Sequence, residues 1–368
     1  MNKIGETTLE IDLSALEHNF NYLKSRIPKG TLFLAVVKAF AYGSDMITIG
    51  KKLEQLNVDY LAVAYTKEGV ALRRAGIQIP ILVLHPQPVN FEVLIDHSLE
   101  PSLYSPRVLQ LFLGMAKGKA QHHYPVHIKF NTGLNRLGFW ENDVDDILKL
   151  LINQEYISVK AILSHLAASE DENEREFSIR QIQRFSNIAE KLHPVLGYLP
   201  IRHMLNTSGI LNYPEAAFDM VRSGIGLYGY GNHPDIDTKL RPVATLRSVI
   251  SQRHRIEPGE SVGYNRKYKS DDYRITATIP IGHADGIGRQ YGGGNTWVWV
   301  KGKKAPIIGN VCMDMIMVDV TAIDCKEGDE VLIFGGEYSA EDFASSANTI
   351  SYEILTAISS RVKRITKS

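Results

Sequence analysis

Lys38 follows directly on the apolar run Leu34-Ala35-Val36-Val37, a position where an amine can do covalent chemistry. A lysine is rarely fully buried without a partner, because an apolar strand cannot replace the hydration that its ammonium loses. Desolvation lowers the pKa of such a lysine, and the neutral amine can form a Schiff base with a carbonyl cofactor such as pyridoxal phosphate. The alternative is a side chain that reaches past the strand end into water.

Other polar residues also follow apolar, strand-like runs: Lys129, Arg136, His165, Asn206, Thr207 and Arg222. An arginine cannot shed its charge, so Arg222 needs a partner. The glycines at 224 and 226 behind it let backbone amides approach an anion, although a flexible loop explains them nearly as well. Lys129 and Arg136 bring two cations into one region, which calls for an intervening anion or for solvent. His165 fits either a hydrogen-bonded core histidine or an imidazole packed on a flat ring.

Short apolar runs in the first part of the chain predict eight strands, at residues 31–38, 59–64, 80–85, 99–104, 125–131, 158–165, 202–206 and 218–222. The segments between them include residues 65–76, whose spacing and closing glycine suit a helix. Eight alternating strand and helix units predict a parallel (β/α)8 TIM barrel, in which strand ends gather at one mouth. An open doubly wound sheet is the competing architecture, because residues 99–104 and 202–206 have weak strand patterns.

The pattern changes near Arg241-Pro242-Val243 to short β runs, at 244–256, 274–281, 296–301, 305–308, 315–320 and 330–334. Turns such as Pro258-Gly259 and Gly335-Gly336 separate them, which predicts a mostly antiparallel β domain. We expect a barrel domain over residues 1–238, whose first few residues can pair with a β domain over 239–368. Residues 349–365 predict a closing helix.

The composition limits the classes of partner. The chain has 41 basic and 41 acidic residues, so no basic field is present to hold nucleic acid or an anionic membrane. Two cysteines, Cys312 and Cys325, form neither a disulfide framework nor a zinc cluster, and we expect no metal site. No apolar run reaches the roughly 18 residues that cross a bilayer, and the first residues lack a signal-peptide pattern. We expect a cytoplasmic protein with a small-molecule substrate.

Nine segments, taken together and in order, resemble the alanine racemase family: residues 35–43, 127–138, 164–167, 203–207, 221–229, 259–264, 279–286, 305–314 and 348–353. The ordered set covers nearly the whole chain and is specific, although no single segment is. The resemblance implies a pyridoxal-phosphate barrel followed by a β domain, in a head-to-tail homodimer with shared active sites. It also implies interconversion of L-alanine and D-alanine, which would supply D-alanine for peptidoglycan.

Matching positions give two residues the role of catalytic base. Lys38 would hold the cofactor covalently and act as one base, and Tyr264 from the β domain of the other subunit would be the second. Arg222 would face the pyridine nitrogen, while His165 would contact the cofactor ring and link Arg222 to Tyr264. Racemisation needs two bases because a proton leaves one face of the substrate carbon and another returns on the opposite face.

The resemblance also implies residues for the cofactor phosphate and the substrate. Tyr42, Thr207, Gly224, Ile225 and Tyr352 would hold the phosphate, with Asn206 beside Thr207 in the cofactor site. Arg136 and the backbone of Met313 of the partner would bind the substrate carboxylate, with Cys312 and Asp314 as supporting neighbours. In many members the lysine at position 129 is carbamylated, which would place an anion between Lys129 and Arg136.

The chain departs from the family pattern at Phe40, Asn131, Ser223 and His283, where asparagine, aspartate, proline and tyrosine are usual. None of these changes removes a catalytic group, but they leave the substrate breadth open, so serine or another small amino acid remains an alternative. A non-catalytic pyridoxal-phosphate carrier on the same barrel would lack the β domain with Tyr264. A decarboxylase or aldolase is disfavoured by Tyr264 and by Arg222, since related decarboxylases use an acidic partner for the ring nitrogen.

Overall fold

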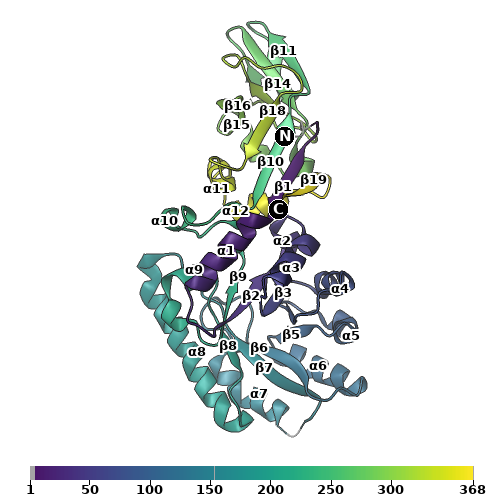
Figure 1. Cartoon of the computed structure of the whole chain (residues 1–368), viewed down its shortest axis with the longest axis vertical. Coiled ribbons are helices and arrows are strands. Elements are labelled where there is room, and N and C mark those ends of the chain that lie inside the picture. The colour runs from purple at the N-terminus through teal and green to yellow at the C-terminus, as the bar shows by residue number, and fades with distance from the viewer. Residues whose placement is uncertain (1–4, 153, 368) are drawn as a thin grey trace.

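The computed structural model describes residues 5–152 and 154–367 and consists of a barrel and an elongated β-rich part above it (Figure 1). Eight parallel strands close the barrel in chain order: β2 (Leu32–Val36), β3 (Tyr60–Val63), β4 (Ile81–Val83), β5 (Glu100–Leu103), β6 (Tyr124–Lys129), β7 (Ile157–Leu163), β8 (Ile201–His203) and β9 (Met220–Ser223). The last strand pairs with the first, Met220 opposite Leu32. The predicted (β/α)8 barrel is confirmed, and an open sheet is excluded.

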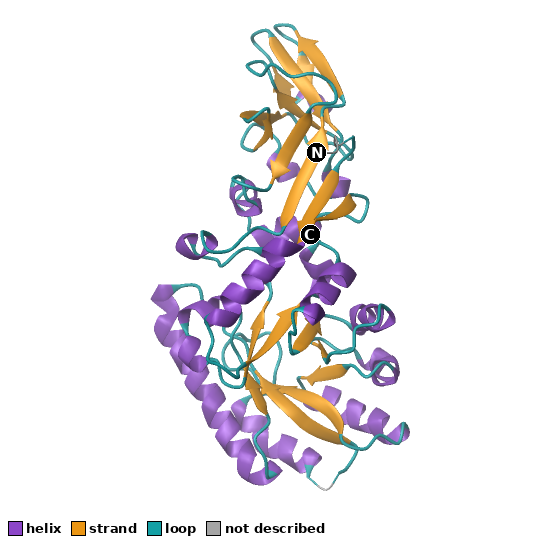
Figure 2. Cartoon of the chain, in the orientation of Figure 1, coloured by secondary structure: helices purple, strands orange, loops and turns teal. Residues whose placement is uncertain are grey.

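Helices surround the barrel strands (Figure 2). They are α1 (Leu13–Ser25), α3 (Met46–Gln55), α4 (Thr66–Arg74), α5 (Phe91–Asp96), α6 (Pro106–Gly118), α7 (Val144–Leu151), α8 (Arg175–Leu196) and α9 (Thr207–Asn212). Asp12, Asp45 and Ser105 each accept a hydrogen bond from a backbone N–H in the first turn of α1, α3 and α6, which fixes where these helices begin. α4 ends close to Gly76, whose φ of +96° favours glycine.

Two barrel strands have weak sequence patterns because they carry polar side chains into the barrel interior. Glu100 lies on β5 and His203 on β8, and both are buried. His127 on β6 joins them, with Nε2 2.7 Å from Glu100 Oε2 and Nδ1 3.2 Å from His203 Nε2. The buried side chains of Glu100 and His203 are therefore hydrogen-bonded inside the barrel through His127.

The second part is built on a nine-stranded sheet in the order β11-β14-β17-β16-β15-β18-β10-β1-β19. The strands are β1 (Thr8–Asp12), β10 (Ala244–Val249), β11 (Gln252–Ile256), β14 (Arg274–Ile279), β15 (Trp297–Val300), β16 (Lys303–Ile308), β17 (Ile316–Asp319), β18 (Glu330–Phe334) and β19 (Lys363–Lys367). A small hairpin, β12 (Ser261–Val262) and β13 (Tyr268–Lys269), and the helices α11 (Ala340–Ser345) and α12 (Ser351–Ala357) complete it, while the short helix α10 (Pro234–Asp237) lies in the segment that leads from the barrel to β10. The start of the chain joins this sheet, because β1 pairs antiparallel with β10.

Two expectations for this part are wrong in detail. The closing helix predicted over residues 349–365 ends at Ala357, and residues 363–367 form β19, which pairs in parallel with β1. That pairing joins the two ends of the chain, which local propensity cannot reveal. The strand predicted over residues 244–256 breaks after Val249, since Ile250 and Ser251 donate to Asp329 and Thr278 and redirect the chain. Among the described residues, no helix is long and apolar enough to cross a membrane.

Candidate active site

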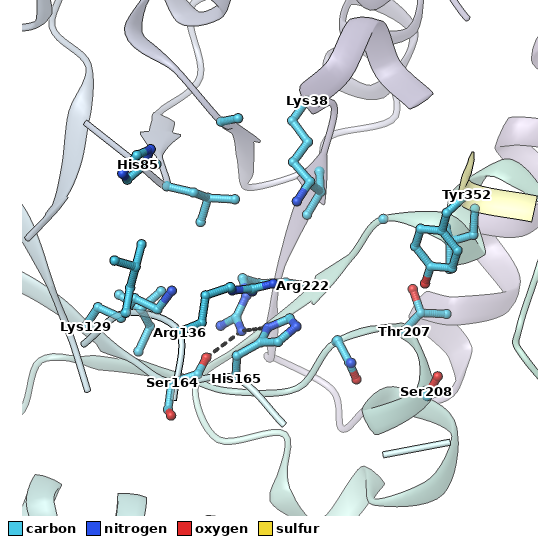
Figure 3. A pocket seen from close by; sticks show the side chains of 18 of the residues that line it. Lys38, His85, Lys129, Arg136, Ser164, His165, Thr207, Ser208, Arg222 and Tyr352 are labelled. Carbon is cyan, nitrogen blue, oxygen red and sulfur yellow. Dashed lines mark hydrogen bonds between the residues drawn. The ribbon is translucent and has the colours of Figure 1, made fainter. Parts of the chain in front are cut away.

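A cavity of about 520 Å³ opens where the carboxyl ends of the barrel strands meet (Figure 3). It brings Tyr352 of α12 together with the barrel residues that were predicted to form the site: Lys38, Tyr42, Lys129, Arg136, His165, Asn206, Thr207, Arg222, Gly224 and Ile225. Figure 3 shows the Lys38 amine pointing toward Arg222 and His165, with Tyr352 and Thr207 at one end of the cavity and Lys129 toward the other. The strand-end rule placed Lys38, His165 and Arg222 at one mouth, whereas Tyr42 and Tyr352 were expected there only from the family resemblance.

The cavity is built for anions. Lys38, Lys129, Arg136 and Arg222 line it, and the described lining contains no carboxylate. The pKa of Lys38 is lowered, first by burial and then by Arg136, with Glu68 acting in the opposite direction. An amine with a lowered pKa is the nucleophile that covalent attachment to a carbonyl requires.

Lys129 carries the clearest consequence of this charge arrangement. It is 8% exposed, and burial together with Arg136 lowers its pKa to about 8. The unfolded chain, in which the lysine pKa is 10.5, therefore holds this proton more tightly than the folded protein. Burying the ammonium destabilises the ligand-free protein fully below pH 8, and this destabilisation disappears as the pH rises from about 8 to 10.5. A neutral amine is also the form that reacts with carbon dioxide to give a carbamate.

Lys129→Met should remove that penalty. In bicarbonate-free buffer at pH 7, we expect the ligand-free variant to be more stable than the wild type by up to about 3 kcal/mol, because the buried ammonium is gone and the side-chain volume is kept. Urea unfolding at pH 7 and pH 10 measures the difference, which should shrink at the higher pH. A variant less stable than the wild type at both pH values would contradict this account of Lys129.

The backbone directly after Lys38 forms a left-handed turn, a conformation that L-amino acids disfavour. α2 (Lys38–Tyr42) contains the consecutive residues Ala39, Phe40, Ala41 and Tyr42, with φ between 52° and 59°, in the left-handed region. Each such residue costs about 1–2 kcal/mol relative to a right-handed conformation. The turn places Lys38 and Tyr42 together on the cavity wall.

Arg222 is the most heavily hydrogen-bonded side chain of the site. It is 5% exposed, and its two terminal nitrogens donate to His203 Nδ1 (2.9 Å), His165 Nδ1 (3.1 Å) and the carbonyl oxygens of Ser164, His203 and Met204. Burial and Arg136 lower its pKa. Among the described residues, its Nε has no protein acceptor and is left as the free donor.

His165 is neutral in this setting. Its pKa is well below the ordinary value because of burial and the Arg222 charge. An arginine can only donate, so Nδ1 of His165 accepts and the ring proton lies on Nε2. The same reasoning assigns Nδ1 of His203 as an acceptor and leaves Nε2–H of His203 to donate to His127. Glu100 ends this chain of hydrogen bonds and accepts from His127.

The end of the cavity near Tyr352 suits a phosphate. A Cβ at position 224 would lie 2.1 Å from Tyr42 Oη, so only glycine lets that hydroxyl approach the backbone. Gly224 and Ile225 are buried residues, and their backbone N–H groups donate to no acceptor in the part of the chain that the structure describes. Unpartnered buried donors beside a phenol hydroxyl form a site that a phosphate would satisfy.

The remaining predicted residues lie elsewhere. Tyr264, Cys312, Met313 and Asp314 line a separate hollow on the β-rich part, which shares no lining residue with the barrel cavity. Tyr264 is 73% exposed, although Asn310 Nδ2 donates to its carbonyl oxygen (3.1 Å) and fixes its backbone. Within one chain, the two proposed bases are therefore not brought together.

Three departures from the family pattern lie in or beside the barrel site. Asn131 is buried, and its Oδ1 accepts from Gly133 and Asn135, which folds the loop that carries Arg136. Ser223 Oγ lies 3.0 Å from Thr207 Oγ1, while Phe40 is 62% exposed. The fourth departure, His283, is exposed on the β-rich part, where its backbone N–H donates to the Cys312 carbonyl oxygen.

Three polar residues that line the cavity were not predicted from the sequence: His85, Ser164 and Ser208. His85 follows β4, Ser164 follows β7, and Ser208 follows Thr207 after β8. All three obey the strand-end rule, so the same rule could have found them.

Comparisons with known proteins agree with this architecture. Residues 11–232 match the model of the alanine racemase N-terminal domain, and residues 243–366 match that of the C-terminal domain. An alanine racemase from Halothermothrix orenii is 36% identical over 366 residues, which cover 97% of this chain and 96% of that protein.

Solved structures agree as well. The alanine racemase of Clostridium difficile 630 has a TM-score of 0.91 at 35% identity and covers 98% of this chain and 96% of its own. The alanine racemase of Bartonella henselae, with covalently bound pyridoxal phosphate, has a TM-score of 0.88 at 30% identity and covers 99% of this chain and 100% of its own. Since both halves match over nearly their full length, the chain belongs to the alanine racemase family.

Proposed function

We propose that this protein interconverts L-alanine and D-alanine with pyridoxal phosphate held in the barrel cavity. The observation that carries the proposal is the placement of the Lys38 amine opposite Arg222, in a cavity lined by cations and by no described carboxylate. Such a cavity complements both a phosphorylated cofactor and the carboxylate of an amino acid. Membership of a family of pyridoxal-phosphate-dependent isomerases supports the same assignment.

The residues present fit the cofactor. Lys38 would bind it covalently, and Tyr42, Thr207, Tyr352 and the N–H groups of residues 224 and 225 would hold its phosphate. The free Nε of Arg222 would donate to the pyridine nitrogen. When bound, pyridoxal phosphate withdraws electrons from the α-carbon of an attached amino acid and makes its proton acidic.

The chain's own groups supply the positioning and the proton transfers. Arg136 would bind the substrate carboxylate, which fixes the α-carbon between the two faces of the site. Lys38 Nζ would take or give the α-proton on one face. The neutral His165, whose Nε2–H is free to donate, would orient the base on the other face.

That second base is Tyr264 of a partner subunit in this proposal. Tyr264 and Met313 are 73% and 58% exposed on the β-rich part of the chain, in a hollow that holds no group able to anchor the cofactor covalently among its described lining. A second copy that places this hollow over the barrel mouth would cover both apolar side chains and complete the site. We therefore propose a head-to-tail homodimer, with Met313, Cys312 and Asp314 forming the wall of the site that the partner contributes.

Two further assignments belong to the proposal. Lys129 would be carbamylated, because its pKa of about 8 leaves much of the amine neutral and reactive in mildly alkaline solution. The carbamate would place a negative charge beside Arg136. We place the border between the barrel and the β domain near residue 239, within the segment 233–242 that neither family model covers.

The test is direct. Purified protein with pyridoxal phosphate is incubated with L-alanine, and D-alanine is followed with a D-amino-acid oxidase. We expect D-alanine to form, and a parallel panel with L-serine and other small amino acids to give slower turnover. A visible cofactor band without D-alanine would point to a carrier, and release of carbon dioxide would point to a decarboxylase. Either result would refute the racemase.

A further inference from the structure

The left-handed turn that carries Lys38 and Tyr42 is held at both ends by side chains that do not line the cavity. We propose that Glu68 and Arg364 are positioning residues, which hold this turn so that Lys38 meets the cofactor and Tyr42 meets the phosphate. This inference rests on the proposed function, because it assigns the two residues a task in that same site.

Glu68, on α4, holds the beginning of the turn. Its Oε1 accepts from the backbone N–H of Ala39 at 2.7 Å, which fixes the peptide group that joins Lys38 to Ala39. Its Oε2 accepts from the N–H groups of Ala64 (2.7 Å) and Tyr65 (3.0 Å) at the end of β3. One carboxylate therefore ties the lysine's own backbone to the neighbouring barrel strand.

Arg364, on β19, holds the end of the turn. Its guanidinium donates to the backbone carbonyls of Gly43 (2.9 Å) and Ser44 (3.3 Å), directly after the turn. It also donates to the carbonyls of Ile358 (2.7 Å), Ser359 and Val362 (2.6 Å), in the segment between α12 and β19. Gly43 packs against α12, since a Cβ there would lie 1.8 Å from the Leu355 carbonyl oxygen. Arg364 thus fastens the turn to the C-terminal segment.

The turn needs such restraints because its residues do not favour its conformation. Ala39, Phe40, Ala41 and Tyr42 are not glycine, so their positive φ values persist only where the surroundings impose them. If either end is released, the turn relaxes toward right-handed geometry and carries Lys38 and Tyr42 away from Arg222 and Gly224. A displacement of about 1 Å at a reacting group can reduce a rate by about 100-fold.

The competing explanation is that Glu68 and Arg364 only stabilise the fold. Residues with similar hydrogen bonds elsewhere in the barrel serve as controls that distinguish this role from positioning of the turn. Glu54, on α3, also accepts from backbone N–H groups, those of Gln78 (2.7 Å) and Ile79 (3.1 Å). Arg73 also donates to several backbone carbonyls, including Ile77 (2.9 Å) and Ile79 (2.7 Å). Neither control residue lines the cavity, and none of the hydrogen bonds that they form in the described part of the chain reaches the turn.

The experiment compares Glu68→Gln and Arg364→Lys with the controls Glu54→Gln and Arg73→Lys. Glutamine keeps the shape of Glu68 but has one acceptor oxygen for its two sets of donors, and lysine keeps the charge of Arg364 but loses its planar fork. Each protein is stripped of cofactor and titrated with pyridoxal phosphate. The visible band and the borohydride-reduced Lys38 peptide, identified by mass spectrometry, give the midpoint of covalent binding. kcat, KM for alanine and Tm are measured on the same samples.

We expect Glu68→Gln and Arg364→Lys to raise the midpoint and lower kcat by about tenfold or more, with KM for alanine nearly unchanged because Arg136 is intact. The controls should keep the wild-type midpoint and kcat, whatever their effect on Tm. If the midpoints and kcat values of Glu68→Gln and Arg364→Lys match those of the controls, this inference is wrong, but the proposed function is unaffected. If Arg364→Lys fails to fold, the isosteric Glu68→Gln decides the matter. A wild type that forms no band would overturn the proposed function, and this inference with it.

Discussion

Lys38→Ala is expected to abolish the visible absorption band of bound pyridoxal phosphate and to reduce alanine racemisation by more than about a thousandfold. The variant loses the covalent attachment and one of the two bases in a single change. Borohydride treatment followed by mass spectrometry of the peptides measures the first effect, and the D-alanine assay measures the second.

Lys149→Ala is the matched control for Lys38, because Lys149 lies exposed on α7 and pairs with Asp146. It should keep the band and the activity. A Lys38→Ala protein with an unchanged, borohydride-sensitive band would mean that another lysine holds the cofactor, and Lys129 would be the first to examine because it lines the same cavity.

Tyr264→Phe is expected to keep the cofactor band and lose racemase activity by about 100- to 10,000-fold, the range of a missing general acid or base. The phenyl ring preserves the packing, and only the proton-carrying hydroxyl is removed. Absorbance and the D-alanine assay on the same sample separate cofactor binding from proton transfer. An active Tyr264→Phe enzyme would assign the second base to another group.

Mixing the two inactive variants tests whether sites are shared between subunits. In a hybrid dimer of Lys38→Ala and Tyr264→Phe subunits, one site has both wild-type residues and the other has neither. Random exchange makes half of the dimers hybrids, so about a quarter of the wild-type activity should return. If exchange is confirmed and no activity returns, each site lies within one chain and the proposed dimer is wrong.

Much of the barrel and its site could be predicted from the sequence, because a residue at the carboxyl end of any barrel strand lies at the same mouth of the barrel. Lys38 and His165 follow barrel strands, Arg222 lies near the end of β9, and strands of a closed parallel barrel end at one mouth. The assignment of Arg222 as needing a partner also followed from its chemistry, since a guanidinium that cannot deprotonate must be hydrogen-bonded where it is buried.

Other features could not be read from the sequence. The left-handed turn at Ala39–Tyr42 runs against the local preference of every residue in it and is imposed by distant groups such as Glu68 and Arg364. β19 forms only because the first described strand of the chain, β1, lies beside it. Both depend on contacts between residues far apart in the chain, which periodicity does not report.

The most direct test of the central claim is racemisation of L-alanine by the holoenzyme in D₂O, with deuterium at the α-carbon followed by NMR and the two enantiomers separated on a chiral column. We expect D-alanine that carries deuterium, approaching an equal mixture with L-alanine because enantiomers have equal free energies. Deuterium that enters L-alanine while no D-alanine forms would show proton exchange on one face only, and would contradict two bases on opposite faces.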